Sequence, residues 1–111
     1  MGRDNGLDLL PGTLDLLILK TLAGEPQHGY GIAQRLKVLS EDVLQVEEGS
    51  LYPALQRMLI KGWVVAEWGQ SENNRRARFY HLTAAGKKQL SAEISDFERV
   101  MAAIGRVIQP A

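Results

Sequence analysis

The chain contains no cysteine among its 111 residues. This absence excludes disulfide bonds, thiolate nucleophiles and cysteine-based zinc sites. Only two histidines are present, His28 and His81, and neither has a carboxylate or a second histidine at ligand spacing. We therefore expect structural or solvent-facing imidazoles and neither a metal nor any other cofactor.

Long hydrophobic runs are also missing. No apolar stretch approaches the length of a membrane span, and Asp4 and Asp8 do not fit a signal peptide. We therefore expect a cytoplasmic protein, which the lack of cysteine also fits. The sequence has no nucleophile elbow, no phosphate-binding glycine loop and no histidine pair, and Ser50 has no histidine–carboxylate arrangement nearby. These absences predict a protein that is not an enzyme.

Residues 49–83 carry the clearest organisation in the chain. Apolar residues at helical spacing predict one buried helix face, formed by Leu51, Leu55, Met58 and Leu59. Gly62 supplies a stop for this helix. Residues 63–68 and 77–82 are two β-prone runs that flank a turn rich in Gly, Ser and Asn. A helix with a polar outer face followed by a basic hairpin is typical of a winged helix-turn-helix, which places the helix in the DNA major groove and the hairpin on the backbone or minor groove.

Two further helices are expected before this segment. The first opens at residues 11–13, ends near Gly24 and presents one apolar face made of Leu14, Leu17, Ile18, Thr21 and Leu22. The second starts at residues 29–31 and buries Ile32, Leu36 and Leu39. Its paired glycines cost helix propensity, which suggests a close approach of the backbone to a neighbouring helix or to a phosphate. Pro53 is expected in the first turn of the third helix, because deeper inside it would remove a needed N–H group.

The last segment has the most regular periodicity. Its apolar residues are spaced alternately by four and three, at Leu90, Ile94, Phe97, Met101, Ile104 and Ile108. Thr83 is suited to cap this helix. An amphipathic terminal helix with such a seam most simply pairs with its copy in a twofold dimer, with Leu10 and Leu14 helping to cover the seam.

The predicted fold is therefore mainly α with a small β-hairpin. Residues 1–82 form a winged helix-turn-helix and residues 83–111 a dimerisation helix, in one compact unit.

Three motifs together resemble one known family. HGYGIAQRL (residues 28–36), GSLYPALQRM (residues 49–58) and RRARFYHLTAAGKKQL (residues 75–90) are similar to the PadR family of bacterial transcriptional regulators. The resemblance runs from about Leu9 to the C-terminus. It implies a dimeric winged-helix repressor that is often released from DNA by a small molecule. The family commonly carries a tryptophan near Phe97, which in some members stacks on flat aromatic effectors.

Three groups of residues are candidates for DNA contact. The start of the second helix contributes Gln27, His28 and Tyr30. The outer side of the third helix contributes Ser50, Tyr52, Pro53, Gln56 and Arg57. The hairpin contributes Asn74, Arg75, Arg76 and Arg78. Gln56 is suited to read adenine and Arg57 guanine, while a phosphate contact or a pair with Glu48 is the alternative for Arg57. For Tyr52, the alternative to DNA contact is a ring half-buried against the core. For the arginines, it is a hairpin tip that is surrounded by solvent.

The net charge of zero gives no sign of a nucleic-acid partner, but the charge is unevenly distributed. Residues 63–90 hold five basic and two acidic side chains, whereas acidic residues precede the third helix at Glu41, Asp42, Glu47 and Glu48. These acids favour the helix N-terminus but oppose phosphate. We therefore expect sequence-specific DNA affinity with weak non-specific binding.

The leading hypothesis is a homodimeric, sequence-specific transcriptional repressor that binds double-stranded DNA at an inverted-repeat operator. A small aromatic effector that releases the DNA is a further hypothesis, with Phe97, Trp63 and Trp68 as candidates for the walls of its pocket. A solid interface without a ligand is the alternative to this pocket. The alternative function is a winged-helix protein-interaction module without direct DNA recognition.

Overall fold

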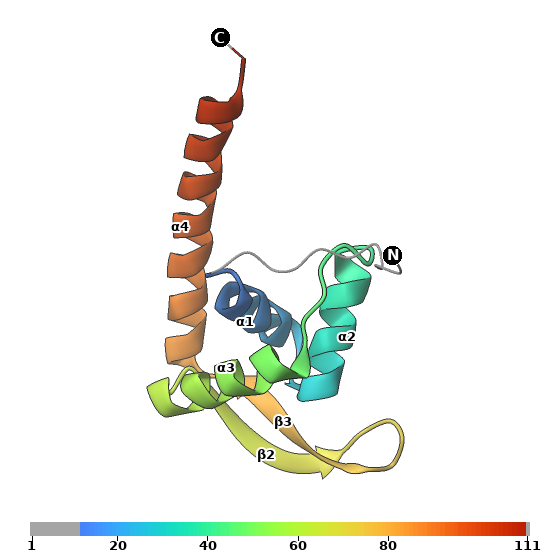
Figure 1. Ribbon diagram of the computed structural model, residues 1–111. Helices are drawn as coiled ribbons and strands as arrows, with labels where there is room; N and C mark the ends of the chain where they lie inside the picture. The colour runs from blue at the N-terminus through green and yellow to red at the C-terminus, as the bar shows by residue number, and fades with distance from the viewer. Residues whose placement is uncertain (1–11, 111) are drawn as a thin grey trace.

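The computed structural model describes residues 12–110. The elements in chain order are α1 (Leu14–Gly24), β1 (Gln27–His28), α2 (Gly29–Leu39), α3 (Glu48–Lys61), β2 (Val64–Gln70), β3 (Arg76–Leu82) and α4 (Ala84–Ile108). Helices α1, α2 and α3 form a body from which the β2–β3 hairpin projects at one end and α4 at the other (Figure 1). This arrangement confirms the predicted fold class, a winged helix-turn-helix with a long C-terminal helix.

The sheet has three antiparallel strands in the order β1-β3-β2. Strands β2 and β3 are the predicted hairpin, with Val64 opposite Leu82 at its base and Gln70 opposite Arg76 near its tip. Strand β1 adds only Gln27 and His28, which pair with β3. The sequence did not predict β1, because two residues are too few to show the alternation that marks a strand.

The core surrounds α1, which contacts α2, α3, β3 and α4. Because neighbours lie on several sides of α1, Leu16 and Leu19 are buried in addition to the predicted Ile18 and Leu22. The prediction of a single apolar face was therefore too narrow. Helix α3 buries the predicted Leu51, Leu55 and Met58 against this core together with Ala54, which was not predicted, while the predicted Leu59 is only partly buried there. Each fully buried aliphatic side chain contributes about 1.5–3 kcal/mol by leaving water.

Two predictions about helix positions were wrong. Leu39 was expected to be buried but is 62% exposed, because it is the last residue of α2 and lies past the core. Pro53 was expected in the first turn of α3 but is the sixth residue of that helix, which begins at Glu48. The carbonyl that would accept the missing N–H belongs to Gly49, an exposed residue, so water can bind it instead.

The junction between the hairpin and α4 is tightly bonded. Thr83 caps α4, as predicted, since its hydroxyl oxygen accepts a hydrogen bond from Gly86 N at 3.0 Å. The same hydroxyl donates to Gly62 O at 2.7 Å and also lies 3.0 Å from Trp63 O. Gly62 ends α3 in the left-handed conformation with φ of 77°. These bonds fix the direction in which α4 leaves the body.

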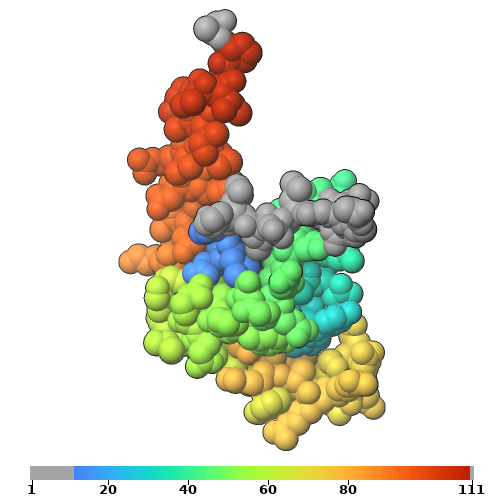
Figure 2. Space-filling model, viewed as in Figure 1, coloured from blue at the N-terminus to red at the C-terminus, as the bar shows by residue number. Residues whose placement is uncertain are grey.

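Helix α4 is anchored at its first half only. Leu90 is buried in the core of its own chain and Ile94 packs against that core, so the prediction that Leu90 belongs to a dimer seam was wrong. The second half of α4 extends beyond the body (Figure 2). Its apolar side chains are partly or largely exposed, namely Phe97, Val100, Met101, Ile104, Val107 and Ile108. Among the residues that the structure describes, no helix combines the length and the apolar character that crossing a membrane requires.

Candidate nucleic-acid interface

The outer side of α3 is built by the helix period. Because Leu51, Leu55 and Met58 face the core, the side chains between them point outward. Ser50, Pro53, Gln56 and Arg57 are all exposed, as predicted. Ile60 lies on the same side and is 77% exposed, although the sequence analysis did not single it out. The exposed side of α3 is thus mainly polar, with one apolar residue near its end.

Tyr52 lies at the edge of this side and is 43% exposed. Its ring rests against Gly29 so closely that a Cβ atom at position 29 would collide with it. The paired-glycine prediction of a close approach is therefore confirmed at Gly29, and the neighbour is α3. Partial burial raises the pKa of the Tyr52 hydroxyl above its ordinary value, and Glu48 and Tyr80 add to this rise. The hydroxyl consequently stays protonated at neutral pH and can donate a hydrogen bond.

The start of α2 lies next to Tyr52. His28 caps α2 through Nδ1, which accepts a hydrogen bond from Gly31 N at 3.0 Å, and its ring meets Phe79 edge-on. Gln27 Oε1 accepts a hydrogen bond from His28 N at 3.2 Å. Both residues are partly buried and hold the local structure, whereas Tyr30 is 62% exposed. Of this predicted group, Tyr30 is the most accessible side chain.

Four of the predicted residues, His28, Tyr30, Tyr52 and Arg78, meet around one hollow of about 410 Å³, which the other predicted residues do not line. Its lining comprises His28, Gly29, Tyr30, Tyr52, Trp68, Ala77, Arg78 and Tyr80. Figure 1 shows the hairpin extending beyond α3 on the side of the body where α2 begins. His28 and Tyr80, which are 52 positions apart in the sequence, therefore share one surface.

The arginines of the hairpin divide between its tip and its strand β3. Arg76 and Arg78 alternate with Ala77 and lie on one face, as predicted. Arg75 lies in the turn, where its carbonyl accepts a hydrogen bond from Ser71 N at 2.8 Å. Asn74 adopts a left-handed conformation with φ of 62°, which asparagine tolerates better than most residues. All four side chains are exposed.

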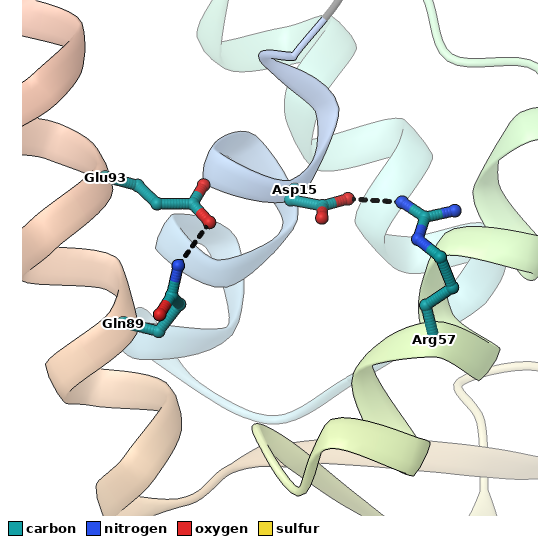
Figure 3. A network of polar contacts seen from close by, with 4 residues as sticks. All are labelled: Asp15, Arg57, Gln89 and Glu93. Atoms are coloured by element: carbon teal, nitrogen blue, oxygen red, sulfur yellow. Dashed lines mark hydrogen bonds and ion pairs between the residues drawn. The ribbon is translucent and has the colours of Figure 1, made fainter.

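Arg57 has a partner that the sequence did not indicate. Its Nη2 atom lies 2.8 Å from Asp15 Oδ1 in α1 (Figure 3). The expected partners of Arg57 were a base, a phosphate or Glu48. Asp15 is 42 residues away along the chain, so no local pattern could have identified it. In this structure Arg57 therefore points from the edge of α3 toward α1.

A second hollow, of about 650 Å³, lies between α1 and α4. Its lining mixes apolar and charged side chains, among them Leu14, Asp15, Arg57, Glu93, Phe97 and Met101. Trp63 and Trp68, which were predicted to share a pocket with Phe97, do not line this groove. Trp63 packs against the core beside Lys61. Trp68 lies in strand β2 of the hairpin.

The described part of the chain offers no cluster of three or more acidic or histidine side chains that could hold a metal ion. Of the two histidines, His28 has the capping role described above. His81 Nε2 lies 3.4 Å from Glu67 Oε2 across the hairpin, although the two atoms do not have hydrogen-bond geometry. The interface therefore consists of polar, aromatic and basic side chains.

Comparisons with known proteins agree with this geometry. The model of the PadR-like transcriptional regulator family matches residues 18–92. A PadR family transcription regulator from Clostridium difficile is 27% identical with a TM-score of 0.75, and the match covers 87% of this chain and 99% of that one. A PadR-like transcriptional regulator from Bacillus cereus is 26% identical with a TM-score of 0.76, covering 90% and 95%.

Two more relatives extend the comparison. A transcriptional regulator from Clostridium thermocellum has a TM-score of 0.81 at 22% identity, covering 88% of this chain and 95% of that one, and so shows the same fold. An uncharacterized protein of Lysinibacillus sphaericus is 28% identical over 93 residues, which is 84% of this chain and 85% of that protein. The similarity therefore spans the helical body, the hairpin and much of α4.

Proposed function

Because this chain belongs to the PadR-like family of transcriptional regulators, we propose that it is a homodimeric, sequence-specific DNA-binding repressor. The family consists of regulators and not of enzymes. One observation carries the proposal: Tyr30 at the start of α2, Tyr52 at the edge of the exposed side of α3 and Arg78 of the hairpin line one hollow. Repression then requires only that the bound dimer occupy DNA which the transcription machinery needs.

In this proposal α3 enters the major groove. Gln56 is the leading candidate for base recognition, because it is exposed in the middle of α3 and its amide can bond to adenine in two places. Ser50 and Pro53 lie on the same side and would approach the groove walls. Arg57 would have to leave Asp15 before it could bind guanine, so we assign it a lesser part in recognition.

The hairpin and the start of α2 would hold the DNA backbone. Arg75, Arg76, Arg78 and Asn74 supply exposed donors at the hairpin, and Tyr30 and Tyr52 supply hydroxyl groups beside it. Such contacts fix the position of the protein on the duplex but carry no sequence information. Because the phosphate contacts are few, affinity should fall with salt less steeply than for strongly basic DNA-binding proteins.

We assign dimerisation to the exposed half of α4. Phe97, Met101, Ile104 and Ile108 recur on one side of that helix and are between 36% and 75% exposed in the single chain. A second copy is the occupant that matches this face, because twofold pairing of a helix with itself brings identical apolar stripes together. Leu14 lines the adjoining groove, whereas Leu10 lies outside the described residues. A twofold dimer requires an inverted-repeat operator.

The groove between α1 and α4 is where we place an effector, if the dimer leaves it open. Phe97 supplies a flat ring there, and the Asp15–Arg57 pair connects the groove directly to α3 (Figure 3). A planar molecule that displaced Arg57 would act on the DNA-binding helix itself. Release of fluorescently labelled DNA during titration with flat aromatic compounds would support this assignment. The absence of release across such a panel favours a solid interface.

The experiment that tests the proposed function is selection of binding sites from randomised duplex DNA. The wild-type protein should enrich an inverted repeat whose half-sites are centred roughly one helical turn apart or a multiple of it. Gln56→Ala should relax the preference at one position in each half-site. Gln34→Ala is the matched control, since Gln34 is exposed on α2 and lies outside the hollow. No enrichment with the wild-type protein would favour the protein-interaction module.

A further inference from the structure

Two arginine–aromatic contacts follow each other along one face of the hairpin. The Arg76 guanidinium lies 4.6 Å from the centre of the Trp68 ring. The Arg78 guanidinium lies 5.8 Å from the centre of the Tyr80 ring. Both distances are within the range of an attractive cation–π contact.

The strand register explains why the two contacts form a series. Opposite residues on neighbouring strands point to the same face, and here Gln70 faces Arg76, Trp68 faces Arg78 and Ala66 faces Tyr80. Each arginine therefore leans toward the base of the hairpin, over the aromatic ring of the next cross-strand pair. Arg76 lies over Trp68, and Arg78 lies over Tyr80. Ala66, the residue opposite Tyr80, has a side chain too small to cover the Tyr80 ring.

The two rings differ in what else they do. Tyr80 is 6% exposed and belongs to the hydrophobic core, so its replacement would disturb the fold. Trp68 is 58% exposed and lies beyond that core. An indole of this size, left largely in water beside an arginine, contributes little to packing. Its contact with Arg76 is the main interaction that the structure records for it.

A guanidinium that stacks by its face keeps its N–H groups free at its edge. The edge is the part that binds phosphate oxygens, so stacking and phosphate binding are compatible. A stacked arginine has also lost part of its side-chain freedom before DNA arrives, which lowers the entropic cost of binding. Trp68 thus restricts a long, flexible side chain to one region of the hairpin face.

We propose that Trp68 is a positioning residue for DNA binding, which holds the Arg76 guanidinium in place for a backbone phosphate without touching DNA itself. This inference rests on the proposed function of the hairpin. It assigns to an exposed tryptophan a role that acts entirely through its arginine neighbour. The role therefore disappears when Arg76 is absent.

The test is a double-mutant cycle on a fixed duplex, read by fluorescence anisotropy. Trp68→Ala should weaken binding about two- to fivefold for each hairpin that engages DNA, the equilibrium factor of an exposed cation–π contact. Trp68→Phe should retain most of the affinity, because a flat ring remains. In the Arg76→Ala background, Trp68→Ala should cause no further loss.

Val65→Ala is the matched control, because Val65 is 54% exposed on the opposite face of β2. It should leave affinity unchanged, and urea unfolding should show that Trp68→Ala is folded like the wild type. If Arg76→Ala weakens binding while Trp68→Ala does not, the positioning role is refuted and the proposed function stands. A further loss from Trp68→Ala without Arg76 would also refute it, by showing direct contact. If the wild-type protein binds no duplex, the proposed function itself fails.

Discussion

At the scale of single residues, glycines mark where elements touch. Gly86 lies in the first turn of α4, where a Cβ atom would collide with the carbonyl oxygen of Trp63 and with the Leu82 side chain. A backbone carbonyl cannot rotate away as a side-chain tip can. This position therefore accepts only glycine if α4 is to keep its direction. Gly49 in α3 is the opposite case, since open space surrounds its Cβ position.

We predict opposite effects of alanine at these two glycines. Gly86→Ala should lower the free energy of unfolding by about 1–3 kcal/mol, the usual cost of overpacking. Gly49→Ala should raise it by up to about 1 kcal/mol, because alanine favours a helix and meets no neighbour. Urea unfolding followed by circular dichroism measures both. A Gly86→Ala protein as stable as the wild type would contradict the close contact.

Residue-level predictions succeeded where one local cause decides the outcome. The stop at Gly62 and the cap at Thr83 depend only on backbone conformation and one side chain, and both are confirmed. The pairing of Arg57 with Asp15 was not predicted, because Asp15 lies on another element. The predicted position of Pro53 in the first turn was wrong, because the exclusion of proline from helix interiors is only an energetic preference. Helix α3 tolerates the cost at an exposed turn.

At the scale of elements, the cap of α4 connects three segments. Thr83 bonds to Gly86 in α4 and to Gly62 at the end of α3, and it lies beside Trp63. We predict that Thr83→Ala lowers the free energy of unfolding by about 1–2 kcal/mol, because it removes the cap and leaves polar groups without a bond. Thr83→Ser is the control and should lose much less, because the hydroxyl remains. Equal losses from both variants would show that the methyl group matters and the hydroxyl does not.

Periodicity predicted the helices and the hairpin because each has many residues facing one core. It missed β1, whose two residues are ordered by pairing with a strand about 50 positions later. It also assigned Leu90 to a seam between chains, because spacing alone cannot tell the core of one chain from the interface of two. Spacing also cannot group Trp63 and Trp68 with Phe97, since that requires the relative placement of the hairpin and α4, and neither tryptophan lines the groove of the single chain.

At the scale of the whole molecule, the surfaces proposed to bind DNA and to self-associate lie at opposite ends. The β2–β3 hairpin, which carries the arginines, projects at one end and the second half of α4 at the other (Figure 1). A substitution at one end should therefore leave the other surface intact. This separation lets the proposed dimer contact be tested without altering the residues proposed to bind DNA.

We predict that Ile104→Glu produces a folded monomer. Ile104 is 45% exposed in the single chain, so the carboxylate stays hydrated there, whereas in a dimer it would be buried against an apolar stripe. Sedimentation velocity should show half the wild-type mass. Val38→Glu is the control, because Val38 is 70% exposed on α2 and should leave the dimer intact. A tight, folded Ile104→Glu dimer would place the interface elsewhere.

Titration of the best selected duplex against a shuffled duplex of the same composition, over salt concentrations from about 50 to 200 mM, tests the central claim most directly. Specific recognition by α3 together with backbone contacts from the hairpin predicts that the selected duplex binds about 10³-fold more tightly or better. Binding to both duplexes should weaken as salt rises. Equal affinity for the two duplexes, or binding that does not respond to salt, would contradict a sequence-specific DNA-binding surface on this protein.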